Sequence, residues 1–119
     1  MRTTTLALSA LFLAGSLGMV SHANAAELAA WNGMTLYVFD KDVGGIPSCY
    51  DECAALWPPA IAKEGEKGEP GWTTVKRTDG TMQWVYDNRP VYFYAKDKKK
   101  GDHLGDGVEG VWHIAMAKP

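Results

Sequence analysis

The sequence predicts a mainly β fold of the β-rich α+β class: a small antiparallel β domain built on a duplicated hairpin, with one short helix. Three observations lead to this prediction. Asn-Gly and Asp-Gly turn signals separate short apolar runs that suit strands. A self-comparison of the chain shows one repeat, in which 33–42 aligns with 88–97. A single segment carries both a helix start signal and a helix stop signal.

The strands follow from the alternation of apolar runs and turn signals. We expect strands at 28–31, 34–40, 72–76, 81–86, 91–94 and 111–116. Two-residue hairpin turns are expected at Asn32-Gly33 and Asp79-Gly80, and a further turn at Asn88-Arg89. Glycine-rich polar loops are expected at 65–71 and 101–110.

The helix is expected at 53–57, between the two halves of the repeat. Asp51 or Ser48 can cap its N-terminus, because short polar side chains accept hydrogen bonds from the first free N–H groups. Pro58-Pro59 ends it, since proline cannot continue a helix.

The segment 1–25 is typical of an export signal. Arg2 precedes an apolar run at 6–20, and Ala23-Asn24-Ala25 forms a small-x-small site for cleavage before Ala26. The alternative is an uncleaved N-terminal anchor, but the run is short and rich in small residues for a membrane span. We therefore expect a signal peptide at 1–25, a single domain at 26–119, and a periplasmic or secreted protein without a membrane span.

The composition narrows the class of protein. The chain has 119 residues, a formal net charge of −2, 46% hydrophobic residues and 22% charged residues, as in an ordinary globular protein. A protein that binds nucleic acid without sequence preference needs a basic face to neutralise phosphates, so we expect no nucleic-acid partner.

The repeat carries a tyrosine motif. Both copies read Tyr-x-aromatic-x-Lys-Asp, and they align without a gap. Two copies suggest a hairpin duplicated about a pseudo-twofold axis. The motif residues are Tyr37, Phe39 and Asp42 in the first copy, and Tyr92, Tyr94 and Asp97 in the second.

Two interpretations of this motif remain open. In a strand, residues i and i+2 share a face, so the two aromatic residues of each copy lie together and oppose an apolar pair. The aromatic residues then form a core, and each aspartate accepts N–H bonds from the turn after its strand. Alternatively, the paired faces line a flat pocket for a planar ligand, which Trp84 and Tyr86 extend by cross-strand contact and His103 covers from its loop.

Five segments of the sequence, which carry four signatures, resemble a secreted, lipoprotein-like repeat family with the Yx(FWY)xxD motif. They are the two tyrosine motifs, the C-x-x-x-C-A-x-x-W-P-P segment at 49–59, Arg-Thr-Asp-Gly at 77–80, and the glycine-rich segment at 105–113. The resemblance implies an exported protein of a family largely without known function, and it supplies no catalytic residues. Haem or electron-transfer roles have been proposed for some similar proteins. The chain lacks a lipobox cysteine, so soluble periplasmic residence is expected.

The two cysteines predict a disulfide, because an exported protein meets an oxidising compartment. Cys49 and Cys53 are too far apart for a disulfide within a regular helix, so Cys49 must precede the helix. The competing interpretation is a copper or zinc site that His113, Met116 or His103 completes. His113 and Met116 would face opposite sides of a strand, which makes them poor co-ligands.

The function that we expect is a non-enzymatic exported module that binds an unknown protein or a small ligand. The sequence has no G-x-S-x-G, H-E-x-x-H or P-loop motif. The alternative is a haem-binding or redox and electron-transfer carrier and, less favoured, a copper-binding protein. C-x-x-C-H is absent, so haem would bind without covalent attachment, through Tyr92, Tyr94 or His103.

Overall fold

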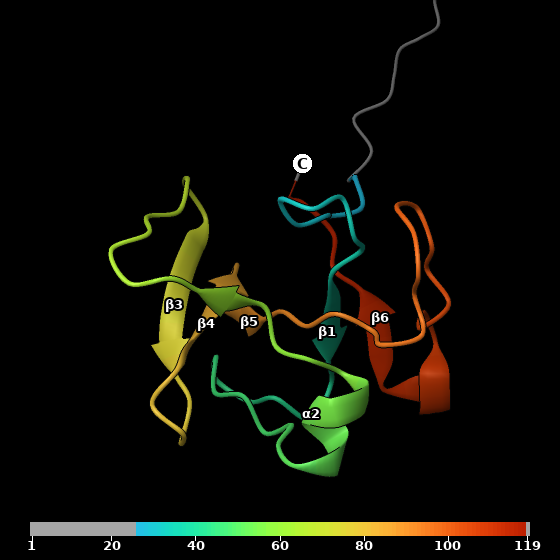
Figure 1. The fold of residues 1–119 in the computed structure, drawn as a ribbon, viewed down its shortest axis with the longest axis horizontal. Helices are drawn as coiled ribbons and strands as arrows, with labels where there is room; N and C mark the ends of the chain where they lie inside the picture. The colour runs from blue at the N-terminus through green and yellow to red at the C-terminus, as the bar shows by residue number, and fades with distance from the viewer. Residues whose placement is uncertain (1–25, 119) are drawn as a thin grey trace, which may run out of the picture.

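The computed structural model describes residues 26–118 (Figure 1). The predicted signal peptide at 1–25 lies outside the described residues. The elements in chain order are β1 (Tyr37–Phe39), α2 (Glu52–Leu56), β2 (Ile61–Ala62), β3 (Trp72–Lys76), β4 (Met82–Tyr86), β5 (Arg89–Pro90), the 3₁₀ turn η2 (Val108–Gly110) and β6 (Trp112–Ile114). Within residues 26–118, strands are the main regular secondary structure and there is one short α-helix, so the predicted mainly β fold class is confirmed.

The strands form two antiparallel sheets that lie side by side in Figure 1. β4 lies between β2 and β3 in the larger sheet and also pairs with β5. β1 pairs with β6 in the smaller sheet. An isolated bridge between Tyr37 and Tyr92 links the first tyrosine motif to the chain that follows β5.

The β3–β4 hairpin has the predicted strands but a longer turn. Trp72 pairs with Tyr86 and Lys76 pairs with Met82, so both strands match the expected bounds to within one residue. The backbone N–H of Arg77 donates to the Thr81 carbonyl at 2.7 Å, which leaves 78–80 in the loop. The two-residue turn predicted at Asp79-Gly80 is therefore wrong: Gly80 adopts a left-handed φ of 91° as the last residue of a longer loop.

The turn into β5 lies one residue earlier than predicted. Tyr86 pairs with Arg89, so Asp87 and Asn88 occupy the turn in place of Asn88-Arg89. Both have positive φ, 50° and 66°, as a two-residue turn of the primed type requires. Aspartate and asparagine tolerate this conformation better than most residues, which explains the shift.

Several predicted strands are shorter in the structure. The segment expected at 28–31 is reduced to a bridge between Ala29 and Thr35. The backbone N–H of Ala30 donates to the Met34 carbonyl at 2.9 Å, so the loop is 31–33 and the two-residue turn predicted at Asn32-Gly33 is wrong. The segment expected at 91–94 follows β5 and contributes only the bridges made by Tyr92. The strand expected at 111–116 is reduced to β6.

The helix begins close to the predicted position, but its cap differs. Asp51 occupies the N-cap position of α2 with φ 58°, and its side chain makes no capping hydrogen bond. The Ser48 hydroxyl donates to Oδ1 of Asp42 at 2.8 Å instead of capping the helix. The predicted side-chain cap by Asp51 or Ser48 is therefore wrong. Pro58 and Pro59 follow the helix closely, as expected.

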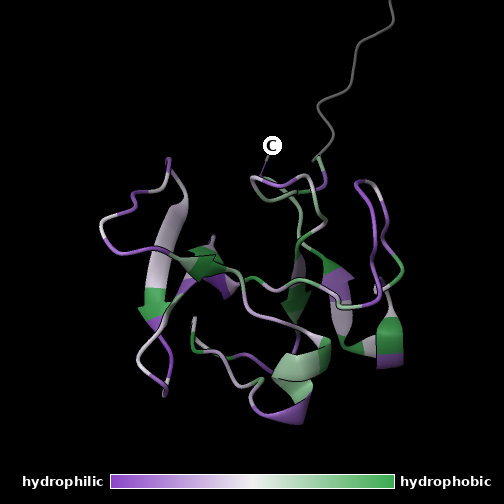
Figure 2. Cartoon of the chain, viewed as in Figure 1, coloured by the Kyte–Doolittle hydropathy of each residue, from purple (hydrophilic) through white to green (hydrophobic). Residues whose placement is uncertain are grey.

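The apolar residues divide into two clusters, which lie on opposite faces of β1 and of the residue before it, Leu36. Leu36 and Val38 belong to a first cluster beneath the larger sheet, whereas Tyr37 and Phe39 belong to a second, aromatic cluster. All four are buried, so this strand is covered on both sides as predicted. Figure 2 shows hydrophilic residues concentrated in the loops between the strands.

Candidate functional site

The two copies of the tyrosine motif meet at the centre of the molecule. The backbone N–H of Tyr37 donates to the carbonyl of Tyr92 at 2.8 Å, and that of Tyr92 donates to the carbonyl of Tyr37 at 2.9 Å. This reciprocal pair relates equivalent residues of the two repeats. It therefore marks the pseudo-twofold axis that the duplicated hairpin predicted.

Four aromatic rings are stacked symmetrically across this axis. Trp57 and Trp112, which occupy equivalent positions of the two repeats, lie nearly parallel at 3° with centroids 3.8 Å apart. Phe39 stacks on Trp112 at 4.2 Å, and Tyr94 stacks on Trp57 at 4.1 Å. Phe39 and Tyr94 are also equivalent residues of the repeat, so the stack obeys the same symmetry as the backbone.

The motif tyrosines exchange hydrogen bonds between the repeats. Tyr37 of the first copy donates its hydroxyl to Oδ2 of Asp97 in the second copy at 2.6 Å. Tyr92 of the second copy donates its hydroxyl to Oδ2 of Asp42 in the first copy at 2.9 Å. The Tyr and Asp of one motif therefore never pair with each other; each pairs with the other repeat.

Each aspartate also holds the loop that follows its own motif. Oδ1 of Asp42 accepts the backbone N–H and the hydroxyl of Ser48, both at 2.8 Å. Oδ1 of Asp97 accepts the backbone N–H of Leu104 at 2.9 Å. The prediction that these carboxylates accept N–H bonds from the following loop is confirmed. Each carboxylate thereby ties its own loop to the tyrosine of the other repeat.

Burial keeps both phenols protonated. Removal from water raises the pKa of Tyr37 well above the ordinary value of a phenol, and the hydrogen bond to Asp97 adds to this. Burial likewise raises the pKa of Tyr92, together with the charge of Asp42. The pKa of Asp42 is raised by burial too, against the lowering effect of its bonds from Ser48 and Tyr92. At neutral pH both tyrosines are therefore hydrogen-bond donors to a neighbouring acid.

The aromatic residues of the two motifs are closed off from solvent. Tyr37 and Tyr92 are 0% exposed, and Phe39 and Tyr94 are each 8% exposed. The backbone at Gly105 also packs against the stack, because a Cβ at this position would come within 2.6 Å of the Trp57 ring. The structure thus places these side chains as the core interpretation expects. No face of the four motif rings is free to stack on a planar ligand in this conformation.

The cysteines form the predicted disulfide. Cys49 and Cys53 are joined, with Cα atoms 5.3 Å apart, and Cys49 precedes α2 as the spacing required. Neither sulfur is a free thiolate, which the copper and zinc alternatives need. Within residues 26–118, no cluster of three or more His, Cys, Asp or Glu is arranged to hold a metal ion.

A buried arginine anchors the disulfide loop to the larger sheet. Arg77 is 4% exposed and donates from Nη2 to the Cys49 carbonyl at 2.6 Å, and from Nη1 to Oε1 of Gln83 at 2.7 Å. Its guanidinium lies 4.1 Å from the centre of the Tyr50 ring. Gln83 is fully buried, and its Nε2 donates a further hydrogen bond to the Val91 carbonyl at 2.9 Å. Arginine suits this position because its planar fork can serve two acceptors at once.

The two histidines among residues 26–118 lie away from the aromatic stack. His103 is exposed in its glycine-rich loop. His113 is on β6, where its Nε2 lies 2.8 Å from Oδ2 of Asp40. Asp40 also pairs with Arg89 at 3.5 Å. Met116 and His113 both line a surface depression of about 230 Å³, although alternation along a strand predicts opposite faces. Met116 lies beyond the end of β6, where that alternation no longer applies.

Trp84 does not lie with the motif aromatic residues, although the sequence predicts that it does. Because Val85 pairs with Pro90, Trp84 lies opposite Val91 and belongs to the first cluster, apart from Tyr92 and Tyr94. The expectation that Trp84 extends the tyrosine surface is therefore wrong. Trp84 lines a different feature of the molecule.

This feature is a pocket of about 290 Å³ at the larger sheet. Three tryptophans line it: Trp84 from β4, Trp72 from β3 and Trp31 from the N-terminal hairpin. Loop 66–69 supplies the opposite wall with Glu66, Lys67, Gly68 and Glu69. The loop packs closely here, because a Cβ at Gly68 would come within 3.0 Å of the Trp84 ring and 2.6 Å of the Cβ of Trp72.

Sequence reasoning missed several of these residues. Trp57 and Trp112 could have been found, because the alignment that superposes the tyrosines also pairs these two tryptophans. Trp31 and Trp72 carried no signal beyond their residue type. Their place in a pocket depends on how loop 66–69 folds, which no spacing in the sequence encodes.

Together, the fold and the site define a small two-repeat β domain, whose halves interlock through stacked tryptophans and exchanged Tyr–Asp hydrogen bonds. The family model described as a secreted repeat of unknown function matches twice, at residues 18–61 and 73–116, once for each repeat. The chain belongs to this family, as the resemblance indicated. No curated protein and no solved structure matches the chain. The residues that the structure describes include no helix long and apolar enough to span a membrane.

Proposed function

We propose that this protein is a non-enzymatic binding module of the periplasm or the secreted fraction, and that it holds a small ligand in the pocket lined by Trp31, Trp72 and Trp84. Export through the signal peptide at 1–25, with cleavage before Ala26, would leave residues 26–119 as one module. The description of the family as secreted supports this location.

The single observation that carries the proposal is the contrast between the two groups of tryptophans. Trp57 and Trp112 are committed to the buried stack, and their faces are covered by other rings. The three remaining tryptophans line a pocket that is open to solvent, where Trp31 is 69% exposed, Trp72 is half-buried and Trp84 is 8% exposed. Concave, mostly apolar sites with a few charged groups are where small ligands bind in proteins.

The haem alternative is less well supported by the geometry. Haem stacked on the motif would need an exposed aromatic face, and the rings of Tyr92 and Tyr94 are covered. Their neighbours leave no room without separation of the two repeats. His103, the other suggested haem ligand, lies in an exposed loop. Saturable haem binding that is lost in a Tyr92→Phe, Tyr94→Phe, His103→Ala triple variant would favour this alternative over the proposal.

The proposal is tested by NMR of the five tryptophan side-chain Nε1–H groups, which separate the two sites within one experiment. The protein is titrated with four probes of different chemistry: choline, benzoate, glucose and benzyl alcohol. We expect at least one probe to shift the signals of Trp31, Trp72 and Trp84 and to leave those of Trp57 and Trp112 in place. Shifts confined to Trp57 and Trp112, or no shift with any of the four probes, would overturn the proposal.

A further inference from the structure

The tryptophan pocket has a corner of aromatic rings rather than a flat platform. The rings of Trp72 and Trp84 lie at 86° to each other with their centroids 6.0 Å apart. A third tryptophan, Trp31, lines the same pocket and is held edge-on by Phe93 at 5.9 Å. A flat ligand such as a sugar ring stacks best on one broad face. A compact, rounded group can instead contact rings that are set at right angles.

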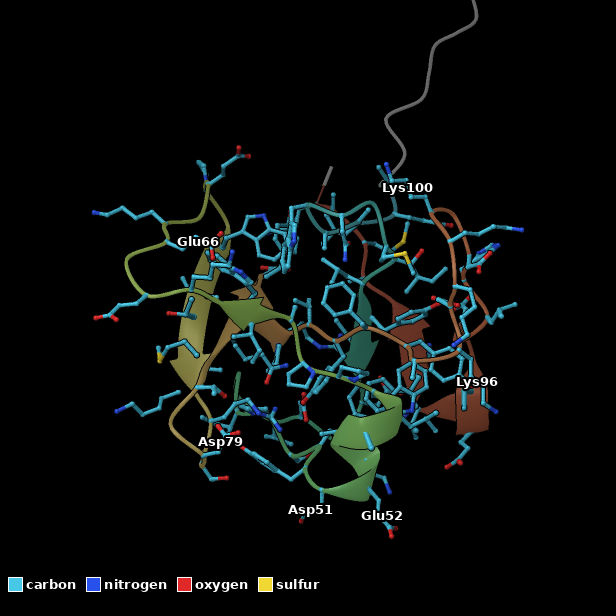
Figure 3. The ribbon with its side chains drawn as sticks, viewed as in Figure 1. Asp51, Glu52, Glu66, Asp79, Lys96 and Lys100 are labelled. Atoms are coloured by element: carbon cyan, nitrogen blue, oxygen red, sulfur yellow. A yellow bond between two sulfur atoms is a disulfide. The ribbon has the colours of Figure 1, made fainter. Side chains whose placement is uncertain are left out.

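The pocket also carries more negative than positive charge. Glu66 and Glu69 line it against a single Lys67. Oε1 of Glu66 accepts the backbone N–H of Lys63 at 2.8 Å, which folds this carboxylate back onto its own loop. Figure 3 shows Glu66 on the loop beside the larger sheet. An anionic ligand would meet two carboxylates here, whereas a cation is attracted by them.

Aromatic faces and carboxylates act together on one class of ligand. The face of an aromatic ring is negative, and it attracts cations whose charge is spread over a weakly hydrated group. A quaternary ammonium has no N–H to satisfy, so it needs aromatic faces and a nearby negative charge rather than hydrogen-bond acceptors. The pocket volume of about 290 Å³ is at the lower limit for a ligand site, which favours a small ligand.

We propose that the pocket lined by Trp31, Trp72, Trp84, Glu66 and Glu69 binds a small organic cation with a quaternary ammonium or methylated amine head group. This inference rests on the proposed function, because it assigns a ligand class to the same pocket. The tryptophans enclose the head group, and the two glutamates balance its charge.

The test compares choline with its neutral isostere, 3,3-dimethylbutan-1-ol, which has the same shape without the charge. We expect both to shift the Nε1–H signals of Trp31, Trp72 and Trp84, and choline to bind at least about tenfold more tightly, a difference of about 1.4 kcal/mol. The advantage should shrink at high salt, since the carboxylates are partly screened. Equal affinity for the two probes would overturn the inference and leave the proposed function standing. If neither of these two probes moves the three signals, the inference fails, and the panel of other probes decides the proposed function.

Variants separate the charge from the rings. Glu69→Gln should reduce choline affinity severalfold and leave the affinity for the neutral isostere unchanged. Trp31→Ala should weaken both probes and leave the protein folded, because the side chain is mostly exposed. Glu64→Gln is the matched control, because Glu64 is an exposed acid of the same loop that does not line the pocket. If Glu69→Gln and Glu64→Gln change choline affinity equally, the charge acts from a distance and the assigned site is wrong.

Discussion

The exchanged Tyr–Asp hydrogen bonds should contribute strongly to stability, and Tyr37→Phe tests this directly. The substitution removes only the hydroxyl, so it leaves the ring packed against Trp57 at 5.3 Å. It leaves two groups without their partner: Oδ2 of Asp97, at 2.6 Å, and the backbone N–H of Gly105, which donates to the same hydroxyl at 3.2 Å. Both residues are buried.

The magnitude follows from these two lost contacts. A hydrogen bond to a charged group contributes about 1.5–3 kcal/mol, and a buried partner left unsatisfied costs a similar amount. We therefore expect Tyr37→Phe to lower the free energy of unfolding by about 2–3 kcal/mol. For a protein of this size that corresponds to a fall in Tm of about 10–20 °C.

The measurement is equilibrium unfolding in urea, followed by tryptophan fluorescence with the disulfide intact. Tyr86→Phe is the matched control. The Tyr86 hydroxyl accepts a single bond, from the backbone N–H of Lys118 at 3.0 Å, in an exposed part of the molecule. Its loss should change the free energy of unfolding by less than about 0.5 kcal/mol. If Tyr37→Phe is as stable as Tyr86→Phe, the exchanged bonds do not hold the repeats together and the reasoning is refuted.

Three further predictions concern the rest of the core. Trp57→Ala, at the centre of the stack, should lower the free energy of unfolding by about 3–5 kcal/mol, whereas Trp31→Ala at the exposed rim should lower it by less than about 1 kcal/mol; urea titration compares the two. Reduction of Cys49–Cys53 should cost about 2 kcal/mol in the loop-entropy model, and the mass of the untreated protein should be two hydrogens below that of the reduced chain. Above about pH 10, the ordinary pKa of a phenol, the free energy of unfolding should fall by about 1.4 kcal/mol per pH unit for each motif tyrosine. The reason is that the raised pKa of each tyrosine keeps a proton in the folded state that the unfolded state releases. Tyr37→Phe should halve this slope, and an unchanged slope would contradict the assignment.

Local features of this fold could be predicted from the sequence because local chemistry determines them. The β3–β4 hairpin, the short helix before Pro58 and the disulfide each depend on residues close together in the chain. The duplication was also visible, since the two motifs align without a gap. Errors occurred at turns, where a shift of one residue changes little in the sequence pattern. Asp87 and Asn88 can both adopt the positive φ that a tight turn needs, and the structure uses that pair.

Partner choice across the pseudo-twofold axis could not be predicted in the same way. The spacing of Tyr37 and Asp42 within one motif says only that the aspartate follows the strand. It does not reveal that the tyrosine reaches the aspartate of the other repeat. That choice depends on how the repeats are placed in space, which is set by the packing of Trp57 against Trp112.

The position of the pocket relative to the repeats bears on its role. The two family matches end at residue 61 and resume at residue 73, so residues 62–72 belong to neither repeat. This intervening segment supplies one wall of the pocket, from Glu66 to Glu69, together with Trp72. The repeats supply the other two tryptophans of the pocket, Trp31 and Trp84, whereas their stacked aromatic residues and their motif acids bind one repeat to the other. The charged wall of the pocket therefore lies where the internal symmetry ends. A chain in which 62–72 is replaced by a Gly/Ser linker of equal length should keep the aromatic stack, seen as unchanged Nε1–H signals of Trp57 and Trp112, and lose choline binding. Retained binding in that chain would show that the segment does not form the site.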